Sequence, residues 1–299
     1  MAVIALLAAV GLAIAVAASM TRHESHGGGG TTQATDSHNP AESGTANATP
    51  LPLGHLNDPS GVAVDTNGNV YVADTGTSVG NNRVLKLPEG SSKASDLCFP
   101  GATATGIAVD DAGSVYVTDY VNDQILKLEI NTSDPIELPF TGLNRASGVA
   151  VDAAGDVYVA DTYNNRILKL GTGAPEPTEL PFTGLDTPFG VAVDTSGNVY
   201  VADSYNNRVL VLAAGASNAT EMPFGELNGP NGIGVDSSGT VYVADYGSNS
   251  VLKLPSGAKA PTKLPVPDLK EVTGIAVDAT GDVYVADGGN RQVLRLSTE

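Results

Sequence analysis

In this 299-residue chain, aspartates are the chemically capable residues that recur most regularly, at the ends of two repeated motifs. One set ends a recurring Gly-[Val/Ile]-[Ala/Gly]-Val-Asp motif: Asp65, Asp110, Asp152, Asp194, Asp236 and Asp278. A second set ends Val-Tyr-Val-[Ala/Thr]-Asp: Asp74, Asp119, Asp161, Asp203, Asp245 and Asp287. Carboxylates can bind metals or act as acids and bases, but an active site is made once whereas a turn is made in every repeat. We interpret both sets as turn-capping residues, so no catalytic residue is expected among them.

Other residues with chemical potential are few and isolated. Cys98 is the only cysteine, which excludes an internal disulfide framework and a thiolate metal cluster. The glycine run 27–30 follows no strand pattern and therefore predicts no phosphate-binding loop. Three histidines lie in a polar segment without a further spaced ligand: His23, His26 and His38. We expect no bound metal and no cofactor.

The elements that carry these residues repeat with a nearly constant period. The motif that ends in the first aspartate set begins at Gly61, Gly106, Gly148, Gly190, Gly232 and Gly274. Each unit contains four short runs rich in β-branched residues, separated by turns, and no run has a helical period. Four strands per repeat of this length are typical of a propeller blade. The sequence predicts an all-β, six-bladed β-propeller with four strands per blade.

The two ends of the repeat region predict how the ring closes. The last unit stops after its third strand, at Gln292 to Leu296, and lacks a fourth strand. A matching segment, Thr49 to Leu53, precedes the first unit, so the N-terminal strand should complete the last blade. The fourth strands are expected to contain proline and to form the outer rim, where a missing N–H costs no ladder bond. Arg83, Arg166 and Arg208 begin third strands and are expected to pair with the second-strand aspartate of their blade.

The ten tyrosines occupy two kinds of position. Six lie in predicted second strands and should be core residues: Tyr71, Tyr116, Tyr158, Tyr200, Tyr242 and Tyr284. The other four lie in loops between second and third strands: Tyr120, Tyr163, Tyr205 and Tyr246. In a propeller that loop shares a face with the connection into the next inner strand. The residues of this connection differ between units and include Asp58, Arg145, Asp186, Phe189, Asn231, Lys270 and Glu271.

Side chains that vary around one channel mouth are typical of a recognition surface. We therefore expect the ligand-binding residues to be Tyr120, Tyr163, Tyr205, Tyr246, Phe189, Asn231 and Arg145. The mixed charge of the mouth favours a polypeptide or a glycan over a phosphate ligand. The alternative, left open by the sequence, is that the loop tyrosines only cover gaps between blades.

The N-terminal part of the chain differs from the repeats. Residues Ala2 to Met20 are almost uninterruptedly apolar, close to the length of a membrane-spanning helix. We expect residues 1–20 to be a transmembrane anchor or uncleaved signal, residues 21–48 a flexible tether, and residues 49–299 the propeller. The propeller would be extracytoplasmic on a single-pass membrane anchor, or secreted if the signal is cleaved. The net charge of −18 disfavours nucleic acid as a partner.

The unit "TELPFTGLDTPFGVAVDTSGNVYVADSYNNRVLVL", Thr178 to Leu212, resembles NHL repeats. More narrowly, it resembles the extracellular sensor domain of mycobacterial receptor-type serine/threonine protein kinases. That family also strings "LPFTGL", "GVAVD", "VYVAD" and "NNRVLKL" into a six-bladed propeller behind one transmembrane helix and a tether. The resemblance covers Thr49 to Glu299. Kinase motifs are absent, so the chain would be a stand-alone relative, or a fragment whose kinase is encoded upstream of Met1.

These observations favour a non-enzymatic, extracytoplasmic propeller of the sensor or adhesion type that binds a ligand or protein, and is itself monomeric. One alternative is a metal-dependent hydrolase or lyase, similar to six-bladed lactonases, acting at the central channel. In that case Asn231 or Glu271 would be expected to hold an ion at the axis. Another alternative is a structural adhesin that binds cell-wall polymer or host matrix.

Overall fold

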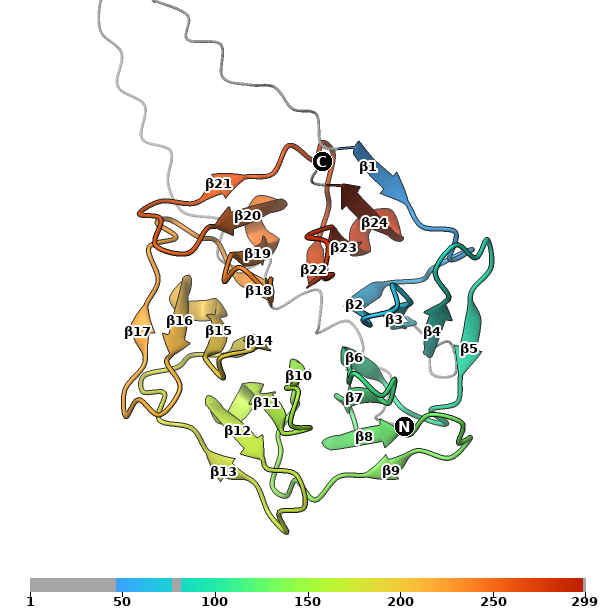
Figure 1. Cartoon of the computed structure of the whole chain (residues 1–299), viewed down its shortest axis with the longest axis horizontal. Coiled ribbons are helices and arrows are strands. Elements are labelled where there is room, and N and C mark those ends of the chain that lie inside the picture. Colours follow the sequence, from blue (N-terminus) through green and yellow to red (C-terminus); the bar gives the residue numbers. More distant parts are fainter. Residues whose placement is uncertain (1–46, 77–81, 298–299) are drawn as a thin grey trace, which may run out of the picture. The chain divides into compact units, whose positions relative to one another are not determined.

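The computed structural model describes residues 47–76 and 82–297. Residues 46–299 form one compact unit. In its described part, six four-stranded antiparallel sheets surround a central axis, as Figure 1 shows. This confirms the predicted six-bladed β-propeller.

The strands of each blade run from the axis to the rim. The inner strands are β2 (Pro59–Val64), β6 (Ala104–Val109), β10 (Val149–Val151), β14 (Pro188–Val193), β18 (Pro230–Val235) and β22 (Val272–Val277). The second strands are β3 (Val70–Asp74), β7 (Val115–Asp119), β11 (Val157–Asp161), β15 (Val199–Asp203), β19 (Val241–Asp245) and β23 (Val283–Asp287). The third strands are β4 (Arg83–Leu87), β8 (Gln124–Leu128), β12 (Arg166–Leu170), β16 (Arg208–Leu212), β20 (Ser250–Leu254) and β24 (Gln292–Ser297). The fourth strands are β5 (Ser95–Leu97), β9 (Ile136–Glu137), β13 (Thr178–Glu179), β17 (Thr220–Glu221), β21 (Thr262–Lys263) and β1 (Asn47–Pro50).

Strand β1 closes the ring, as the sequence predicts. It pairs antiparallel with β24, placing Ala48 opposite Leu296 and Pro50 opposite Leu294, and Figure 1 shows the two strands side by side. The strand begins at Asn47, two residues before the expected start. Leu51 N–H extends the pairing by donating to the carbonyl of Val293 (2.9 Å). The first and last parts of the propeller are thereby held in one sheet.

The fourth strands differ from the prediction in one respect. They lie at the rim, but Pro139, Pro181, Pro223 and Pro265 follow them by two residues instead of lying within them. Around Pro139, Leu138 N–H donates to Ile125 O (2.8 Å) and Phe140 N–H donates to Leu138 O (2.7 Å). The proline therefore occupies a place between two bonded amides, where its missing N–H removes no hydrogen bond.

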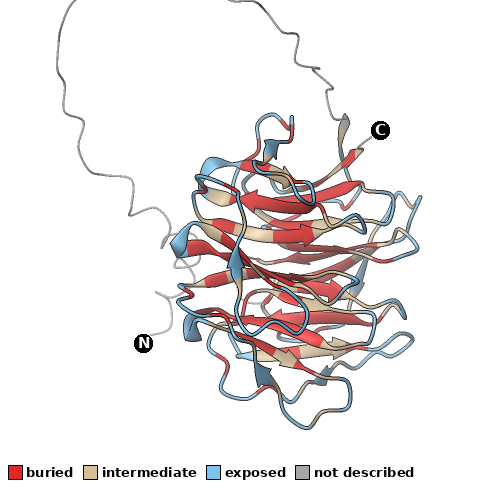
Figure 2. Cartoon of the chain, turned by 60° about the vertical axis from the view of Figure 1, so that its left-hand side comes forward, coloured by how far each residue is buried: buried red, intermediate tan, exposed pale blue. Residues whose placement is uncertain are grey.

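The hydrophobic core is divided into six clusters, one between each pair of neighbouring blades. Figure 2 shows buried residues running along the stacked strands and exposed residues at their turns. Inner-strand glycines allow the blades to approach this closely. A Cβ on Gly61 would lie 2.6 Å from the carbonyl oxygen of Thr105, and one on Gly274 would lie 2.9 Å from that of Ser60. The recurrent glycine is thus required by blade-to-blade contact.

The first aspartate set caps turns, as predicted. Asp194 accepts hydrogen bonds from the backbone of Ser196 and Asn198, and its second oxygen accepts from the Tyr200 hydroxyl (2.9 Å). The tyrosine-to-aspartate bond recurs in all six blades. The second-strand tyrosines are buried, which confirms them as core residues. Burial and then the bond to Asp194 raise the pKa of Tyr200 to about 12.

Replacing Tyr200 by phenylalanine should lower the free energy of unfolding by about 1.5 kcal/mol, because Asp194 loses one donor while the ring stays buried. Since the folded-state pKa of Tyr200 lies above the unfolded value of 10.0, its contribution is complete below pH 10 and is lost as pH rises towards 12. Measured by urea unfolding between pH 8 and 11, the free energy of unfolding should therefore fall less steeply with pH in Tyr200→Phe than in the parent. The control is Tyr205→Phe in the same blade, whose half-exposed side chain should leave the free energy of unfolding unchanged.

Within the described ranges, no helix is long and apolar enough to span a membrane. The predicted anchor, Ala2 to Met20, lies outside these ranges, as do residues 21–46 of the predicted tether.

Candidate ligand-binding face

We define the loop face as the side of the propeller that carries the loops between second and third strands and the connections into the inner strands. Buried second-strand aspartates organise it. Asp161 accepts hydrogen bonds from Asn144 N–H (2.8 Å), Asn164 Nδ2 (2.8 Å) and Arg166 Nε (2.7 Å). Blade 4 repeats this arrangement around Asp203. The predicted arginine pairs are confirmed at Arg83, Arg166 and Arg208.

Blades without this arginine supply other donors to their second-strand aspartate. Gln292 Nε2 donates to Asp287 Oδ2 (2.7 Å), and Ser248 Oγ donates to Asp245 Oδ2. In blade 2, Asn122 Nδ2 donates to Asp119 (2.7 Å). Because these carboxylates are buried and bonded within their own loops, they position the loop face and are not free to react.

Neighbouring blades are interlocked on the loop face. The side chain of Asn165, at the end of one loop, accepts a hydrogen bond from Thr187 N–H in the connection into the next blade (2.8 Å). Asn249 and Glu271 repeat this contact between blades 5 and 6 (2.6 Å). Both asparagines have positive φ, a conformation that asparagine tolerates better than most residues. The loops of blades 2 to 5 therefore fix the start of the next inner strand, so this part of the face is held before any ligand arrives.

The four loop tyrosines occupy two different positions. Tyr120 and Tyr246 directly follow the second-strand aspartate, whereas Tyr163 and Tyr205 lie one residue further along. Tyr163 is 49% and Tyr205 50% exposed, and Tyr246 is half-buried. Tyr120 is only 4% exposed, so the expectation that it offers a contact surface to a ligand is wrong. Its ring is covered instead by a side chain from the next blade.

That covering side chain is Arg145. Its guanidinium carbon lies 5.2 Å from the centre of the Tyr120 ring and 5.7 Å from that of Tyr163, within cation–π range of both. The backbone N–H of Arg145 donates to Asp123 Oδ1 (2.6 Å). Burial is the main reason that the pKa of Tyr120 rises to about 12, and its hydrogen bond with Arg145 raises the pKa of the guanidinium. The structure brings three expected site residues together here: Tyr120, Arg145 and Tyr163.

The opposite part of the loop face is acidic. Burial and the neighbouring carboxylates of Glu271 and Asp74 raise the pKa of Asp58, although its side chain reaches solvent and Arg291 partly opposes the shift. Burial and the carboxylates of Glu271 and Asp58 raise the pKa of Tyr246. The expected residue Tyr246 therefore belongs to a cluster with Asp58 and Glu271. On the loop face, Arg145 thus lies with two tyrosines over blades 2 and 3, whereas Asp58 and Glu271 lie with Tyr246 on the other side.

Phe189 and Asn231 occupy equivalent, half-buried positions near the starts of β14 and β18. Both lie where the pairing with the second strand shifts register, and such bulges redirect side chains. Asp186 and Lys270 are exposed, and their backbone N–H groups donate to Asp203 and Asp287. Phe189 and Asn231 thus lie on inner strands beside the channel.

Sequence reasoning missed Val121, which is 57% exposed. Counted from the second-strand aspartate, Val121 occupies the same place as Tyr163 and Tyr205 in the next two blades. That alignment is visible in the repeat and was the available signal. Val121, Tyr163 and Tyr205 form an exposed row over blades 2 to 4, which we call the apolar row.

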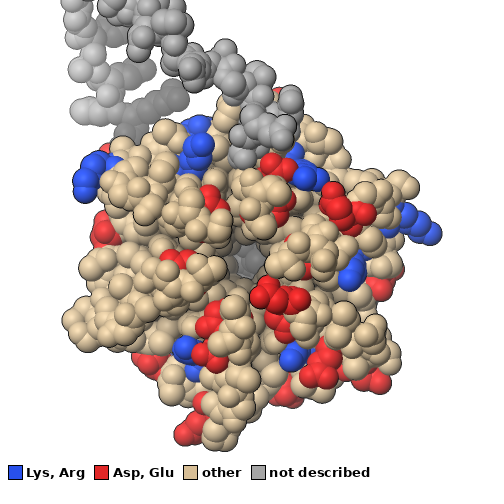
Figure 3. Space-filling view, viewed as in Figure 1, with Lys and Arg blue, Asp and Glu red and all other residues tan. Residues whose placement is uncertain are grey.

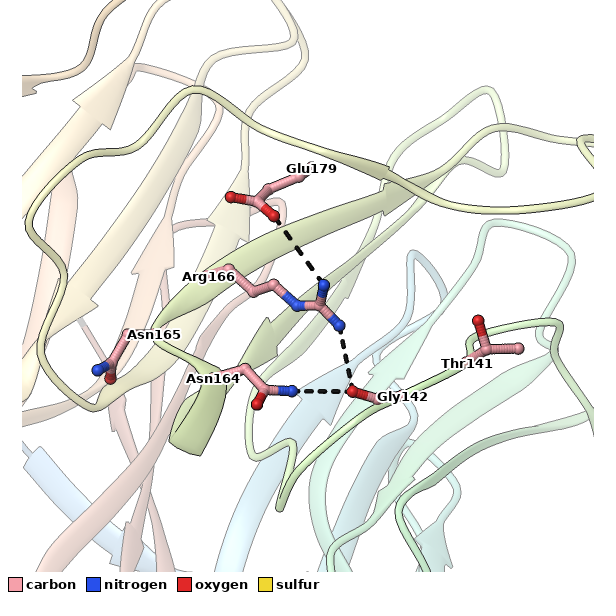
Figure 4. A pocket seen from close by; sticks show the side chains of 6 residues that line it. All are labelled: Thr141, Gly142, Asn164, Asn165, Arg166 and Glu179. Carbon is pink, nitrogen blue, oxygen red and sulfur yellow. Dashed lines mark hydrogen bonds and ion pairs between the residues drawn. The ribbon is translucent and has the colours of Figure 1, made fainter.

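A polar depression of about 590 Å³ lies at the edge of blade 3, lined by Thr141, Gly142, Asn164, Asn165, Arg166 and Glu179 (Figure 4). Asn164 Nδ2 and Arg166 Nη2 both donate to Gly142 O, at 2.8 and 3.2 Å. Blade 4 makes the same two bonds from Asn206 and Arg208 to Gly184. Because the depression is built from bonds that the repeat makes more than once, we interpret it as structural.

Residues 47–76 and 82–297 contain no group of three or more His, Cys, Asp or Glu side chains arranged to hold a metal ion. The segment Gly76 to Gly80 reads Gly-x-Ser-x-Gly, but it connects the antiparallel strands β3 and β4 and not a strand and a helix. It therefore lacks the setting of a nucleophile elbow, and residues 77–81 lie outside the described part. Figure 3 shows one face of the ring, hollowed at its centre, with acidic side chains beside the opening.

Comparison with protein families gives one match, to the model described as NHL repeat, over residues 56–87, 143–170, 185–212 and 227–254. No curated protein sequence matches the chain. A streptogramin B lyase structure is 16% identical (TM-score 0.65), over 84% of this chain and 97% of that one. A gluconolactonase from Xanthomonas campestris is 16% identical (TM-score 0.68), over 85% and 90%. A chain of the nidogen/laminin complex is 20% identical (TM-score 0.67), over 76% and 88%. At these identities the likeness shows the fold alone.

Proposed function

We propose that this six-bladed β-propeller, which contains NHL repeats, is a non-enzymatic binding module whose loop face takes up a ligand or protein outside the cytoplasm. The observation that carries the proposal is the apolar row with Arg145 beside it. Exposed side chains of this size, gathered on one face, are typical of a contact surface. The opposite face repeats small polar turns whose aspartates are bonded internally, as at Asp152 and Asp194.

Selection from a random peptide library against the full chain tests this assignment. Selected peptides should bind the variant Tyr163→Ser/Tyr205→Ser at least about 30-fold more weakly, since anchoring aromatic residues commonly contribute about 2 kcal/mol each. Both side chains are half-exposed, so the variant should melt like the parent. The matched control, Ala153→Arg/Thr195→Arg, crowds two exposed turns of the opposite face in the same two blades. Loss of binding in this control but not in the serine variant would reverse the assignment of faces.

The proposed location rests on the apolar segment Ala2 to Met20 and has its own test. Cys98 is the only cysteine of the chain and is exposed. A membrane-impermeant maleimide should therefore label the propeller on intact cells, and Cys98→Ser should abolish the label. Labelling that occurs only after the cells are broken would place the propeller inside.

A further inference from the structure

The apolar row is confined to half of the loop face. Blades 5 and 6 have Gly247 and Gly289 at the position that Val121, Tyr163 and Tyr205 occupy in blades 2 to 4. A Cβ on Gly247 would lie 2.5 Å from Asn228 Cγ, and one on Gly289 would lie 2.7 Å from Lys270 Cβ. Positions 247 and 289 therefore have no room for a side chain. A partner that needs apolar contact finds it on blades 2 to 4.

Arg145 and Arg291 form no ion pair within the described residues, but Arg291 is exposed whereas Arg145 is half-buried. Four others pair with carboxylates of the chain itself: Arg83, Arg166, Arg208 and Arg295. The Arg145 guanidinium is held against Tyr120 and Tyr163. The neighbouring carboxylate of Asp123, which accepts from the Arg145 backbone N–H, forms no ion pair with this guanidinium. A half-buried cation of this kind, in a chain of net charge −18, is available for a carboxylate from outside.

We propose that the loop face of blades 2 to 4 binds an extended polypeptide segment through one acidic side chain. Its Asp or Glu carboxylate pairs with Arg145, and apolar side chains flanking that acid lie on the apolar row. The planar fork of arginine matches a carboxylate with two parallel hydrogen bonds. Tyr120 uses one N–H of the Arg145 guanidinium, which leaves its other donors for the ligand. Asp58 and Glu271 on the other side repel a carboxylate and so favour its place beside Arg145. This inference rests on the proposed function.

A polypeptide fits this surface better than a glycan or a phosphate. Val121 has neither a ring face nor a hydroxyl, so it offers a sugar little beyond its methyl groups, whereas it can pack against apolar side chains. A polyanion meets the field of 33 acidic against 15 basic residues, which opposes binding more strongly as the ligand's charge increases. A peptide can present a single carboxylate among apolar side chains, which matches the one arginine, Arg145, beside the apolar row.

The test uses peptides selected against the full chain in a double-mutant cycle. Most selected peptides should contain one Asp or Glu with aromatic or aliphatic residues on either side. Replacing that acid by its amide should weaken binding at least about tenfold. Arg145→Gln should weaken binding of the acidic peptide similarly. The amide peptide should bind Arg145→Gln as tightly as it binds the parent chain, because the pair is already broken. Arg145→Lys, which keeps the charge but not the fork, should retain part of the affinity.

Each other outcome overturns a defined part of the account. Peptides that lack an acid, yet lose binding to Tyr163→Ser/Tyr205→Ser, would overturn the carboxylate proposal and leave the proposed function standing. Equal affinity of the parent and Arg145→Gln for acidic peptides would do the same, provided both melt alike. If no peptide can be selected but oligogalacturonate binds in a way that depends on Arg145, the ligand is an acidic glycan and not a polypeptide. Binding of neither probe would overturn the proposed function as well.

Discussion

A chain that begins at Gly54, and so lacks β1 and the residues up to Leu53, should lose its closed, monomeric form. The deletion removes Leu53, a core residue that is 5% exposed, and losing such a side chain usually lowers the free energy of unfolding by about 2–5 kcal/mol. The deletion also removes the ladder between β1 and β24 and the bond from Leu51 to Val293. Strand β24 would then become an unpaired edge, open to pairing with another copy.

The matched control for this deletion is a chain that begins at Ala46, which lacks the N-terminal segment but keeps β1. Light scattering after size exclusion, together with thermal unfolding, compares the two. The chain from Ala46 should be monomeric and melt like the full chain, whereas the chain from Gly54 should melt lower and form oligomers. Equal melting and equal mass in both would mean that β1 does not hold the ring closed.

Gly61→Ala should be strongly destabilising although it adds a single methyl group. The new Cβ would lie 2.6 Å from Thr105 O and 3.3 Å from Ile107 N, both backbone atoms of the next inner strand, which cannot turn aside. We expect a loss of about 3 kcal/mol, at the upper end for overpacking, and a fall in melting temperature of about 6–12 °C.

Gly171→Ala is the control for the added methyl group. A Cβ on Gly171 would meet nothing closer than 3.8 Å, and the next blade has an alanine, Ala213, at the same place. This variant should melt within a degree or two of the parent, since it adds no close contact. If Gly61→Ala melts like Gly171→Ala, the blades are packed less tightly at the axis than the structure has them.

The fold could be predicted because every blade meets the same neighbour in the same way. Gly61 and its five equivalents recur since each faces the backbone of the next inner strand. The aspartates recur since each caps the same turn or holds the same loop, as Asp194 and Asp161 do. Such residues appear once per repeat, so the period itself separates them from residues that act only once. The exact edges of the fourth strands were less predictable, because apart from β1 they pair over only two or three residues.

The candidate site could be predicted only in part, because its arrangement depends on contacts between blades. The sequence places Tyr120 in a loop, but the residue that buries it, Arg145, comes from the connection into the next blade. The same contact makes Arg145 an oriented cation and not a solvated surface charge. Val121 was missed since a single loop valine suggests no chemistry, and only its alignment with Tyr163 and Tyr205 gives it meaning.

Amide hydrogen exchange with and without a selected peptide reports where on the propeller binding occurs. We expect slower exchange in the loops 120–123, 162–165 and 204–207 and in the connection around Arg145, since these carry the apolar row and the neighbouring cation. The turns at 152–155 and 194–197, in the same blades but on the opposite face, should exchange as before. Protection of those turns with unchanged loops would contradict the claim that the loop face is the binding surface.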